Sequence, residues 1–258
     1  MKIYWTVTGE VHALKGIDAT FPAESVTAVV GPSGSGKSSL LRILACIDRP
    51  TAGQVQIGAE EVQALPARRR RRVRRQQIGY VFQRPGDNLI AYLSAREHLA
   101  LSARLRGHRL GDDGDRLLDS LGLGARAAHR PHQLSGGEQQ RLAFASAVVG
   151  RPTLVVADEP TAELDSANAR TLMETVVALR AEGIAFAVAT HDPVVVELAD
   201  QTLHLRHGAL EAEAKRGRTL SVIDQAGRIQ LPPEALKLFP DRRAVLEVGD
   251  DDVRITPP

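Results

Sequence analysis

The sequence predicts an α/β fold in which helices cover a parallel sheet, followed by a small β-rich segment. Four short runs are mostly apolar, as strands buried on both faces are: 25–30, 78–82, 153–157 and 184–189. Segments with helical spacing alternate with them, at 37–47, 94–105, 115–121, 135–149 and 166–181. Alternation of this kind is typical of parallel sheets.

Composition excludes several functions before any motif is considered. The 258 residues are 43% hydrophobic and 25% charged, which suits a globular protein with its own core. The single cysteine, Cys46, excludes an internal disulfide and a multi-cysteine metal site. Aromatic residues, at 3%, are too sparse for a platform that stacks nucleic-acid bases. We see no secretory signal and no apolar run long enough to span a bilayer.

The first motif is a glycine-rich loop, GPSGSGKS at 31–38. It matches G-x-x-x-x-G-K-[ST] and lies between an expected strand and an expected helix, where this pattern binds phosphate. Its glycines let backbone N–H groups converge on phosphate oxygens at the positive end of the helix dipole. We expect Lys37 to reach the β- and γ-phosphates and Ser38 to bind Mg²⁺. The flanking elements disfavour the alternative, a glycine-rich turn with an unrelated lysine.

Two carboxylates follow the apolar run at 153–157, at the strand end where α/β folds place ligands. Asp158 fits the carboxylate that supports Mg²⁺ in a phosphate-loop site, and Glu159 fits a general base for an attacking water. A solvated acidic pair is the alternative, and the phosphate loop disfavours it.

The third motif, LSGGE at 134–138, opens another helix. Ser135 and Glu138 have capping-box spacing, and Gly136 and Gly137 allow close approach of another molecule. The motif is either a plain helix cap or a second phosphate-binding helix terminus. At this point the chain resembles the ATP-binding cassette (ABC) family, whose signature motif has this form. The resemblance covers about residues 1–213 and includes YVFQ at 80–83, AELD at 162–165 and THD at 190–192.

The resemblance implies the fold of a P-loop NTPase: an ABC nucleotide-binding domain with a parallel core sheet, an antiparallel β subdomain and a helical subdomain inserted at about 85–150. It implies a Mg²⁺-dependent ATPase with ATP and Mg²⁺ as cofactors. The implied nucleotide-binding residues are Tyr4, Gly31, Ser33, Gly34, Ser35, Gly36, Lys37, Ser38, Ser39, Asp158, Ser135, Gly136, Gly137 and Asp165.

Catalytic roles carried over from the family fall on Glu159, His191, Gln83 and Lys37, and metal binding on Ser38, Gln83 and Asp158. Gln83 resembles the glutamine that contacts Mg²⁺ or the attacking water and senses the membrane partner. His191 resembles the histidine that contacts the γ-phosphate, and Asp165 the aspartate that couples two sites. Tyr4 fits the aromatic residue that stacks on adenine; Trp5 is the neighbouring alternative, and core packing is another interpretation of Tyr4.

In this family the signature of one chain covers the ATP held by the other. Because this chain has one copy of each motif, the resemblance implies a second ATP-binding subunit, as a homodimer, and a separate integral-membrane permease. We therefore expect a transporter ATPase in the cytoplasm, peripheral on the inner face of the cell membrane, with no nucleic-acid partner. A soluble ABC ATPase acting on nucleic acid or ribosomes, or a tail-mediated regulatory ATPase, are the alternatives.

The stretch ACIDRPTAG at 45–53 resembles cassettes of the MacB and LolD type, which favours export. The transported substrate and the direction of transport reside in the permease, so the sequence leaves both open.

Positions 68–75 hold seven arginines; without them, 26 Lys and Arg stand against 31 Asp and Glu. The run could bind nucleic acid or anionic lipid. We favour a solvated segment before the 78–82 strand, where relatives also carry basic residues. Because five of the arginines are consecutive, we expect them to girdle a helix rather than line one face.

After the cassette we expect a linker at 214–219 and a small β-rich tail at 220–258. Residues 222–232 resemble the opening of AbrB-like swapped-hairpin domains, which are dimeric and often bind DNA. Three adjacent acidic residues, Asp250 to Asp252, oppose phosphate binding, so we favour a dimerisation or regulatory role for the tail.

Overall fold

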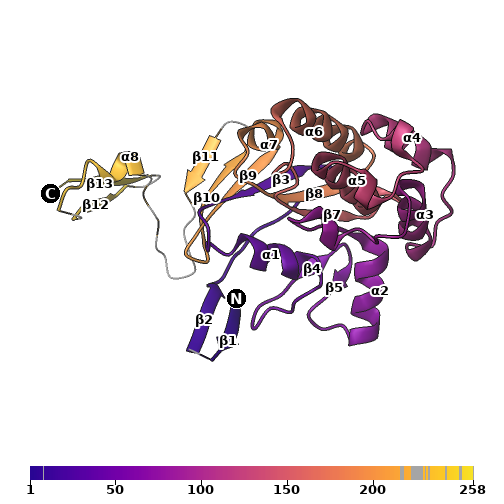
Figure 1. Cartoon of the computed structure of the whole chain (residues 1–258). Coiled ribbons are helices and arrows are strands. Elements are labelled where there is room, and N and C mark those ends of the chain that lie inside the picture. The colour runs from indigo at the N-terminus through magenta and orange to yellow at the C-terminus, as the bar shows by residue number, and fades with distance from the viewer. Residues whose placement is uncertain are drawn as a thin grey trace.

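A seven-stranded sheet forms the centre of the protein, in the order β11-β10-β9-β3-β8-β7-β6 (Figure 1). The computed structural model describes residues 1–7, 9–215, 218–221, 229, 231, 233–241, 243–249 and 252–257. The strands of this sheet are β3 (Val26–Val30), β6 (Ile78–Val81), β7 (Leu154–Asp158), β8 (Ala185–Ala189), β9 (Gln201–Arg206), β10 (Ala209–Lys215) and β11 (Arg218–Ser221). The predicted parallel core is confirmed: β3, β6, β7, β8 and β9 are parallel, and β10 and β11 add an antiparallel edge.

Helices cover both faces of the sheet because its central strands are apolar on both faces. In β7, Val155 and Ala157 pack into a core cluster shared with α5 (Gly136–Val148) and α6 (Ser166–Arg180). Leu154 and Val156 pack on the opposite side, with α1 (Lys37–Leu44) and Val73 of α2 (Ala67–Gln77). Helix α7 (Pro193–Leu198) lies beside α6. A strand that is buried on both faces of a sheet has a continuous apolar sequence, which is why these strands could be predicted.

Smaller elements surround the central sheet. Strand β1 (Lys2–Thr6) pairs antiparallel with β2 (Gly9–Leu14), and β4 (Gln56–Ile57) with β5 (Glu60–Glu61). The segment expected to be helical, 85–150, carries α3 (Ala95–Leu105), α4 (Asp112–Ser120), α5 and the short 3₁₀ turns η1 (Pro85–Asp87), η2 (Gly124–Arg126) and η3 (Pro131–Gln133). None of the helices formed by the described residues is long and apolar enough to cross a membrane.

The C-terminal part differs from the expected linker at 214–219. Ala214 and Lys215 end β10, Arg218 and Thr219 begin β11, and the two strands pair antiparallel. Backbone pairing at a sheet edge needs no apolar pattern, so the basic composition of this stretch wrongly suggested a linker. Beyond this edge lie α8 (Pro233–Leu236) and the antiparallel pair β12 (Val245–Val248) and β13 (Val253–Thr256). The AbrB-like stretch 222–232 lies outside the described residues except at Ile229 and Leu231.

Candidate active site

The loop between β3 and α1 has a backbone that only glycine fits at two close-packed positions. Gly31 and Gly36 have φ values of 152° and 104°. A Cβ on Gly36 would lie 2.6 Å from the carbonyl oxygen of Ala13, and one on Gly31 would overlap the carbonyl oxygen of Leu205. A side chain at either position would collide with β2 or β9, so only glycine lets the loop pack this closely against these strands.

The loop gathers hydrogen-bond donors. Gly36 caps α1 without a side-chain hydrogen bond, so the helix begins with free backbone N–H groups. The Lys37 ammonium donates to the carbonyl oxygens of Gly31 (2.7 Å) and Pro32 (3.2 Å). The Ser35 hydroxyl is buried and has no hydrogen-bond partner among the described residues. Free N–H groups, an ammonium and an unpartnered hydroxyl are the groups that phosphate oxygens accept from, so the loop fits a polyphosphate.

The sheet order places the second motif beside this loop. Strands β3, β8 and β7 are neighbours and parallel, so the loop and Asp158 lie at the same edge. Burial raises the pKa of Asp158, while a hydrogen bond from the Ser38 hydroxyl and the nearby Lys37 ammonium act in the opposite direction. Among the described residues, no group of three His, Cys, Asp or Glu could hold a metal. The Ser38–Asp158 pair fits Mg²⁺, a cation that takes few protein oxygens and completes its shell with phosphate and water.

Glu159 is held in an unusual backbone position at the end of β7. Its φ is 51°, and its N–H donates to the carbonyl oxygen of Ala189 at the end of β8 (2.9 Å). Oε2 of Glu159 lies 2.8 Å from Nδ1 of His191. The N–H of Thr190, the residue before His191, donates to the carbonyl oxygen of Val29 at the end of β3 (3.1 Å). Backbone hydrogen bonds thus tie the three strand ends together and place a carboxylate and an imidazole beside the loop.

Gln83 follows β6, the edge strand next to β7, and its side chain is exposed. Asn88 braces this turn: its Oδ1 accepts from the N–H of Phe82 (2.8 Å), and its Nδ2 donates to the carbonyl oxygen of Tyr80 (2.7 Å). Gln83 has no hydrogen-bond partner among the described residues, so the structure places it near this edge but does not join it to Ser38 or Asp158. Asn88 was not singled out in the sequence because a lone asparagine gives no pattern.

The signature motif lies against a different part of the chain. Ser135 caps α5, with a reciprocal hydrogen bond to Glu138. A Cβ on Gly137 would lie 3.1 Å from Cδ2 of Leu164, in the AELD segment, and not against the phosphate loop. Asp165 caps α6 by accepting from the N–H of Asn168 (2.8 Å), and this hydrogen bond lowers its pKa. The signature motif and the AELD segment therefore lie side by side and form one surface.

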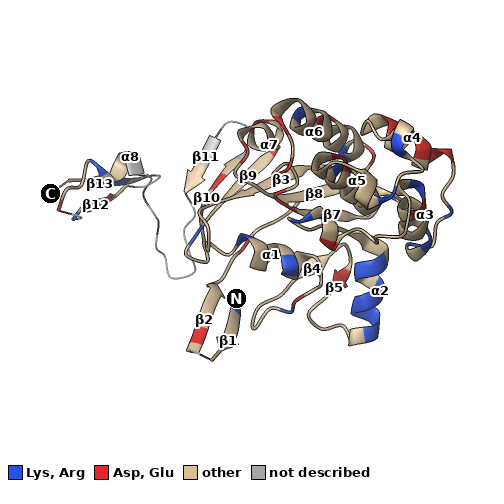
Figure 2. Ribbon diagram, in the orientation of Figure 1, with Lys and Arg blue, Asp and Glu red and all other residues tan. Residues whose placement is uncertain are grey.

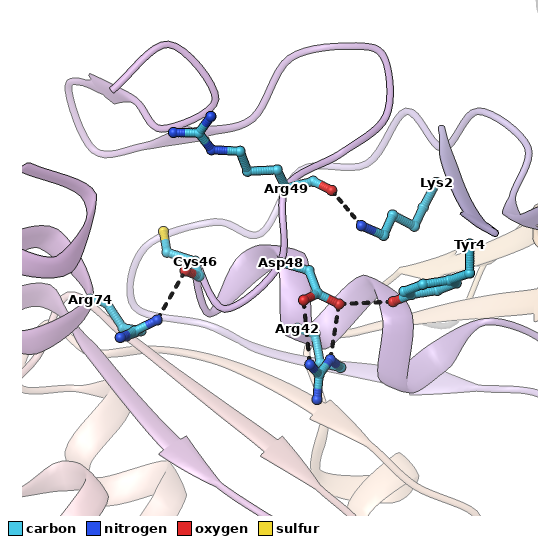
Figure 3. Close-up of polar contacts among 7 residues, drawn as sticks. All are labelled: Lys2, Tyr4, Arg42, Cys46, Asp48, Arg49 and Arg74. Carbon is cyan, nitrogen blue, oxygen red and sulfur yellow. Dashed lines mark hydrogen bonds and ion pairs between the residues drawn. The ribbon is translucent and has the colours of Figure 1, made fainter. Parts of the chain in front are cut away.

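Tyr4 is tied to α1 (Figure 3). Its hydroxyl donates to Oδ2 of Asp48 (2.9 Å), which also accepts from Nε of Arg42 (3.0 Å). The Lys2 ammonium lies 4.7 Å from the centre of the Tyr4 ring. Hydrogen bonding from Arg42 lowers the pKa of Asp48, while burial raises that of Tyr4. Trp5 points to the other side of β1 and is 68% exposed. Sequence reasoning assigned no role to Arg42 or Asp48, although Asp48 lies in the ACIDRPTAG stretch.

A family model described as ABC transporter matches residues 14–162, which hold the phosphate loop, the signature motif and the two carboxylates. The chain belongs to the ABC transporter family. As a member it uses ATP with Mg²⁺ and hydrolyses ATP, so it is the ATPase part of an ABC transporter.

Known relatives agree with this assignment. The chain is 43% identical over 206 residues to the lipoprotein-releasing system ATP-binding protein LolD of Ruegeria sp. (strain TM1040), covering 78% of this chain and 90% of LolD. It is 40% identical over 212 residues to the macrolide export ATP-binding/permease protein MacB 1 of Aeromonas hydrophila, covering 81% of this chain. The chain spans only 32% of the length of that MacB.

Solved structures show the same ABC fold. A dimeric structure of a bacterial ABC transporter cassette matches with a TM-score of 0.77 and 35% identity, covering 84% of this chain and 96% of the cassette. A dimeric post-hydrolysis state bound to ADP and phosphate matches with a TM-score of 0.76 and 34% identity, over the same shares of the two chains. The predicted ABC fold and family are confirmed.

Proposed function

We propose that this ABC ATPase holds ATP through the loop at 31–38 and its neighbours. The free N–H groups of α1 and the Lys37 ammonium bind the β- and γ-phosphates. The buried hydroxyl of Ser35 donates a hydrogen bond to a phosphate oxygen. Ser38 and Asp158, with Gln83, hold Mg²⁺, which neutralises charge on the phosphates. The observation that carries this proposal is the meeting of Lys37, Ser38, Asp158 and Glu159 at one sheet edge, since Ser38 and Lys37 both act on the Asp158 carboxylate.

Glu159 is the base in this proposal. Its side chain is 13% exposed, its backbone is fixed by the hydrogen bond from its N–H to Ala189, and its carboxylate lies beside His191, so it can take a proton from water without first reorganising. His191, whose side chain is 79% exposed, donates Nδ1–H to that carboxylate. With a proton on Nε2 as well, the ring donates a second hydrogen bond to a γ-phosphate oxygen. Lys37 stabilises the charge that develops on the phosphate oxygens.

We further propose that two copies of the chain complete each site. The signature lies against the AELD segment and not against its own phosphate loop, which leaves Ser135 and Gly137 free for the nucleotide of another chain. The related cassettes are dimeric. Asp165, beside the signature, would then lie between the two sites.

Mixing two inactive variants tests this arrangement. Lys37→Ala damages the phosphate loop, and Ser135→Arg blocks the signature, so each variant alone should hydrolyse little ATP. A mixed dimer contains one site with both motifs intact, and mixing should restore hydrolysis. If no activity returns although mixed dimers form, the shared site is refuted.

The partner in this proposal is a separate integral-membrane permease, and the transporter is of the export type. LolD and MacB, the relatives described above, support both statements. The chain would then work in the cytoplasm, peripheral on the inner face of the cell membrane. Co-purification from membranes with a polytopic protein is the expected result. Recovery with ribosomes or nucleic acid alone would instead favour a soluble ABC ATPase.

We also propose that the ATPase domain, expected to end near residue 213, extends through β11 to Ser221, and that the chain beyond it forms a separate add-on with a dimerising or regulatory role. The match to the family model ends at residue 162, and the described strands β12 and β13 pair only with each other. A chain ending at Ser221 keeps the whole central sheet. It should keep ATP hydrolysis while losing any dimerisation in the absence of nucleotide.

A further inference from the structure

Helix α2 concentrates positive charge. Seven of its 11 residues are arginine, and Val73 is its only buried residue. Figure 2 shows the helix as a nearly continuous basic segment at the lower edge of the view. A solvated helix tolerates a few basic residues, but this density places like charges three and four residues apart, where they repel one another.

The arginines divide by face. Arg68, Arg71, Arg72 and Arg75 follow the spacing i, i+3, i+4, i+7, which is one side of a helix, and all four are exposed. Val73 lies on the opposite side and is buried in the core. The seven arginines together surround the helix, as expected: these four form an outward stripe, Arg69 and Arg74 flank it, and Arg70 lies on the side of Val73.

The other three arginines of α2 are used by the fold itself. Arg69 forms an ion pair with Glu60 (2.9 Å), Arg74 donates to the carbonyl oxygen of Cys46 (3.5 Å), and Arg70 is half-buried. The stripe is different: Arg72 donates to Gln76 (3.0 Å), and no described carboxylate pairs with any of the four. Their charge is available to something outside the chain.

The stripe continues onto the next helix. Arg75 and Gln76 share a groove of about 300 Å³ with Arg104, in the last turn of α3, and with Leu101, Leu105 and Gly107. Leu105 is 48% exposed. The basic surface therefore carries a fifth arginine and a small apolar patch at its end.

We propose that the stripe of Arg68, Arg71, Arg72 and Arg75 docks on anionic phospholipid headgroups at the membrane surface. A row of arginines presents charge along a line, which suits an array of headgroup phosphates. Apart from the seven arginines of α2, the chain has 26 basic against 31 acidic residues, so an anionic surface attracts this helix and repels the remainder, which orients the ATPase. Helix α2 has no aromatic residue to stack on a base, which disfavours single-stranded nucleic acid. The inference rests on the proposed function in one respect, that the chain works beside a membrane.

Vesicle flotation of the full chain tests this surface, with phosphatidylcholine vesicles compared with vesicles containing about one-third phosphatidylglycerol. Binding should need the anionic lipid and weaken as salt rises. Changing all four stripe arginines to Gln should lower vesicle binding at least ~100-fold, since each basic residue near such a surface contributes a factor of about five. The four Arg→Lys changes should retain binding. ATP hydrolysis in solution should be unchanged in both variants.

A matched control changes four exposed arginines elsewhere, Arg109, Arg116, Arg151 and Arg170, to Gln. It removes the same net charge but should keep vesicle binding. Equal losses in control and stripe variants would overturn the proposal, as would equal binding to neutral vesicles. Binding of the stripe to duplex DNA or RNA in preference to anionic vesicles would also overturn it. The two proposals are tested separately. If the Arg→Gln stripe variant loses vesicle binding but still co-purifies with the permease, the lipid contact is supported independently of the transporter proposal.

Discussion

Nδ1 of His191 lies 2.8 Å from Oε2 of Glu159. The two residues come after neighbouring strands β8 and β7, and the hydrogen bond between the backbones of Glu159 and Ala189 fixes their separation. The carboxylate is mostly buried and the imidazole mostly exposed. Glu159 is thus the fixed inner residue of the pair. His191 is the outer residue and can turn toward a third group, as a residue that contacts the γ-phosphate must.

Replacing the imidazole should affect turnover more than binding. His191→Ala should slow ATP hydrolysis by on the order of 10²-fold, since a positioned hydrogen-bonding group is lost, and leave ATP affinity within about twofold. Phosphate release and nucleotide binding measure the two effects. His108→Ala, at an exposed histidine between α3 and α4, is the control. Equal rates for the two variants would remove His191 from the site.

The Asp158 carboxylate should lower the stability of the nucleotide-free protein at neutral pH while being required for hydrolysis. Burial raises its pKa in the folded chain above the unfolded value of about 3.9. Its favourable effect on folding is therefore complete below that unfolded pKa and is lost as pH rises through the folded pKa. At neutral pH the buried charge is a cost, so Asp158→Asn should raise the Tm of the nucleotide-free protein while abolishing Mg²⁺-dependent hydrolysis. A Tm of Asp158→Asn at pH 7 that is equal to or lower than that of the wild-type chain would contradict this prediction.

Two glycines of the phosphate loop should respond differently to a methyl group. Gly34 and Gly36 both have positive φ, 75° and 104°. A Cβ on Gly34 meets open space, whereas one on Gly36 meets Ala13 at 2.6 Å. Gly34→Ala should therefore cost about 1 kcal/mol of stability, and Gly36→Ala clearly more. Denaturant titration measures both. Equal losses would show that the loop can move away from β2.

Tyr4 and Trp5 lie on opposite sides of β1, so their variants separate the two candidates for adenine stacking. Tyr4→Ala should weaken ATP binding by roughly tenfold, since stacking on a base contributes ~1–3 kcal/mol. Tyr4→Phe, which keeps the ring but loses the hydrogen bond to Asp48, should have a smaller effect. Trp5→Ala should have none. The reverse pattern in a fluorescent-nucleotide assay would assign stacking to Trp5.

The sequence predicts best what depends on pattern along the chain. β7 is apolar at its first four buried positions, and GPSGSGKS and LSGGE each join residue type to an element boundary, so the strand ends and helix starts that form the site were expected. Contacts between distant segments carry no such pattern. The Tyr4–Asp48–Arg42 cluster joins β1 to α1, and Asn88 braces its turn by reaching back to Tyr80. The linker expected at 214–219 was wrong for the same reason, because strand pairing at an edge is decided by the neighbouring backbone.

The role of Glu159 as the base is tested by the rate of phosphate release by the wild-type chain and by Glu159→Gln in Mg²⁺-ATP, with ATP binding measured in parallel. Glutamine keeps the shape of the side chain and cannot accept the proton. For Glu159→Gln we expect unchanged ATP binding and hydrolysis at least ~100-fold slower, because a positioned base contributes ~10²–10⁴-fold. Near-normal hydrolysis by Glu159→Gln would contradict it.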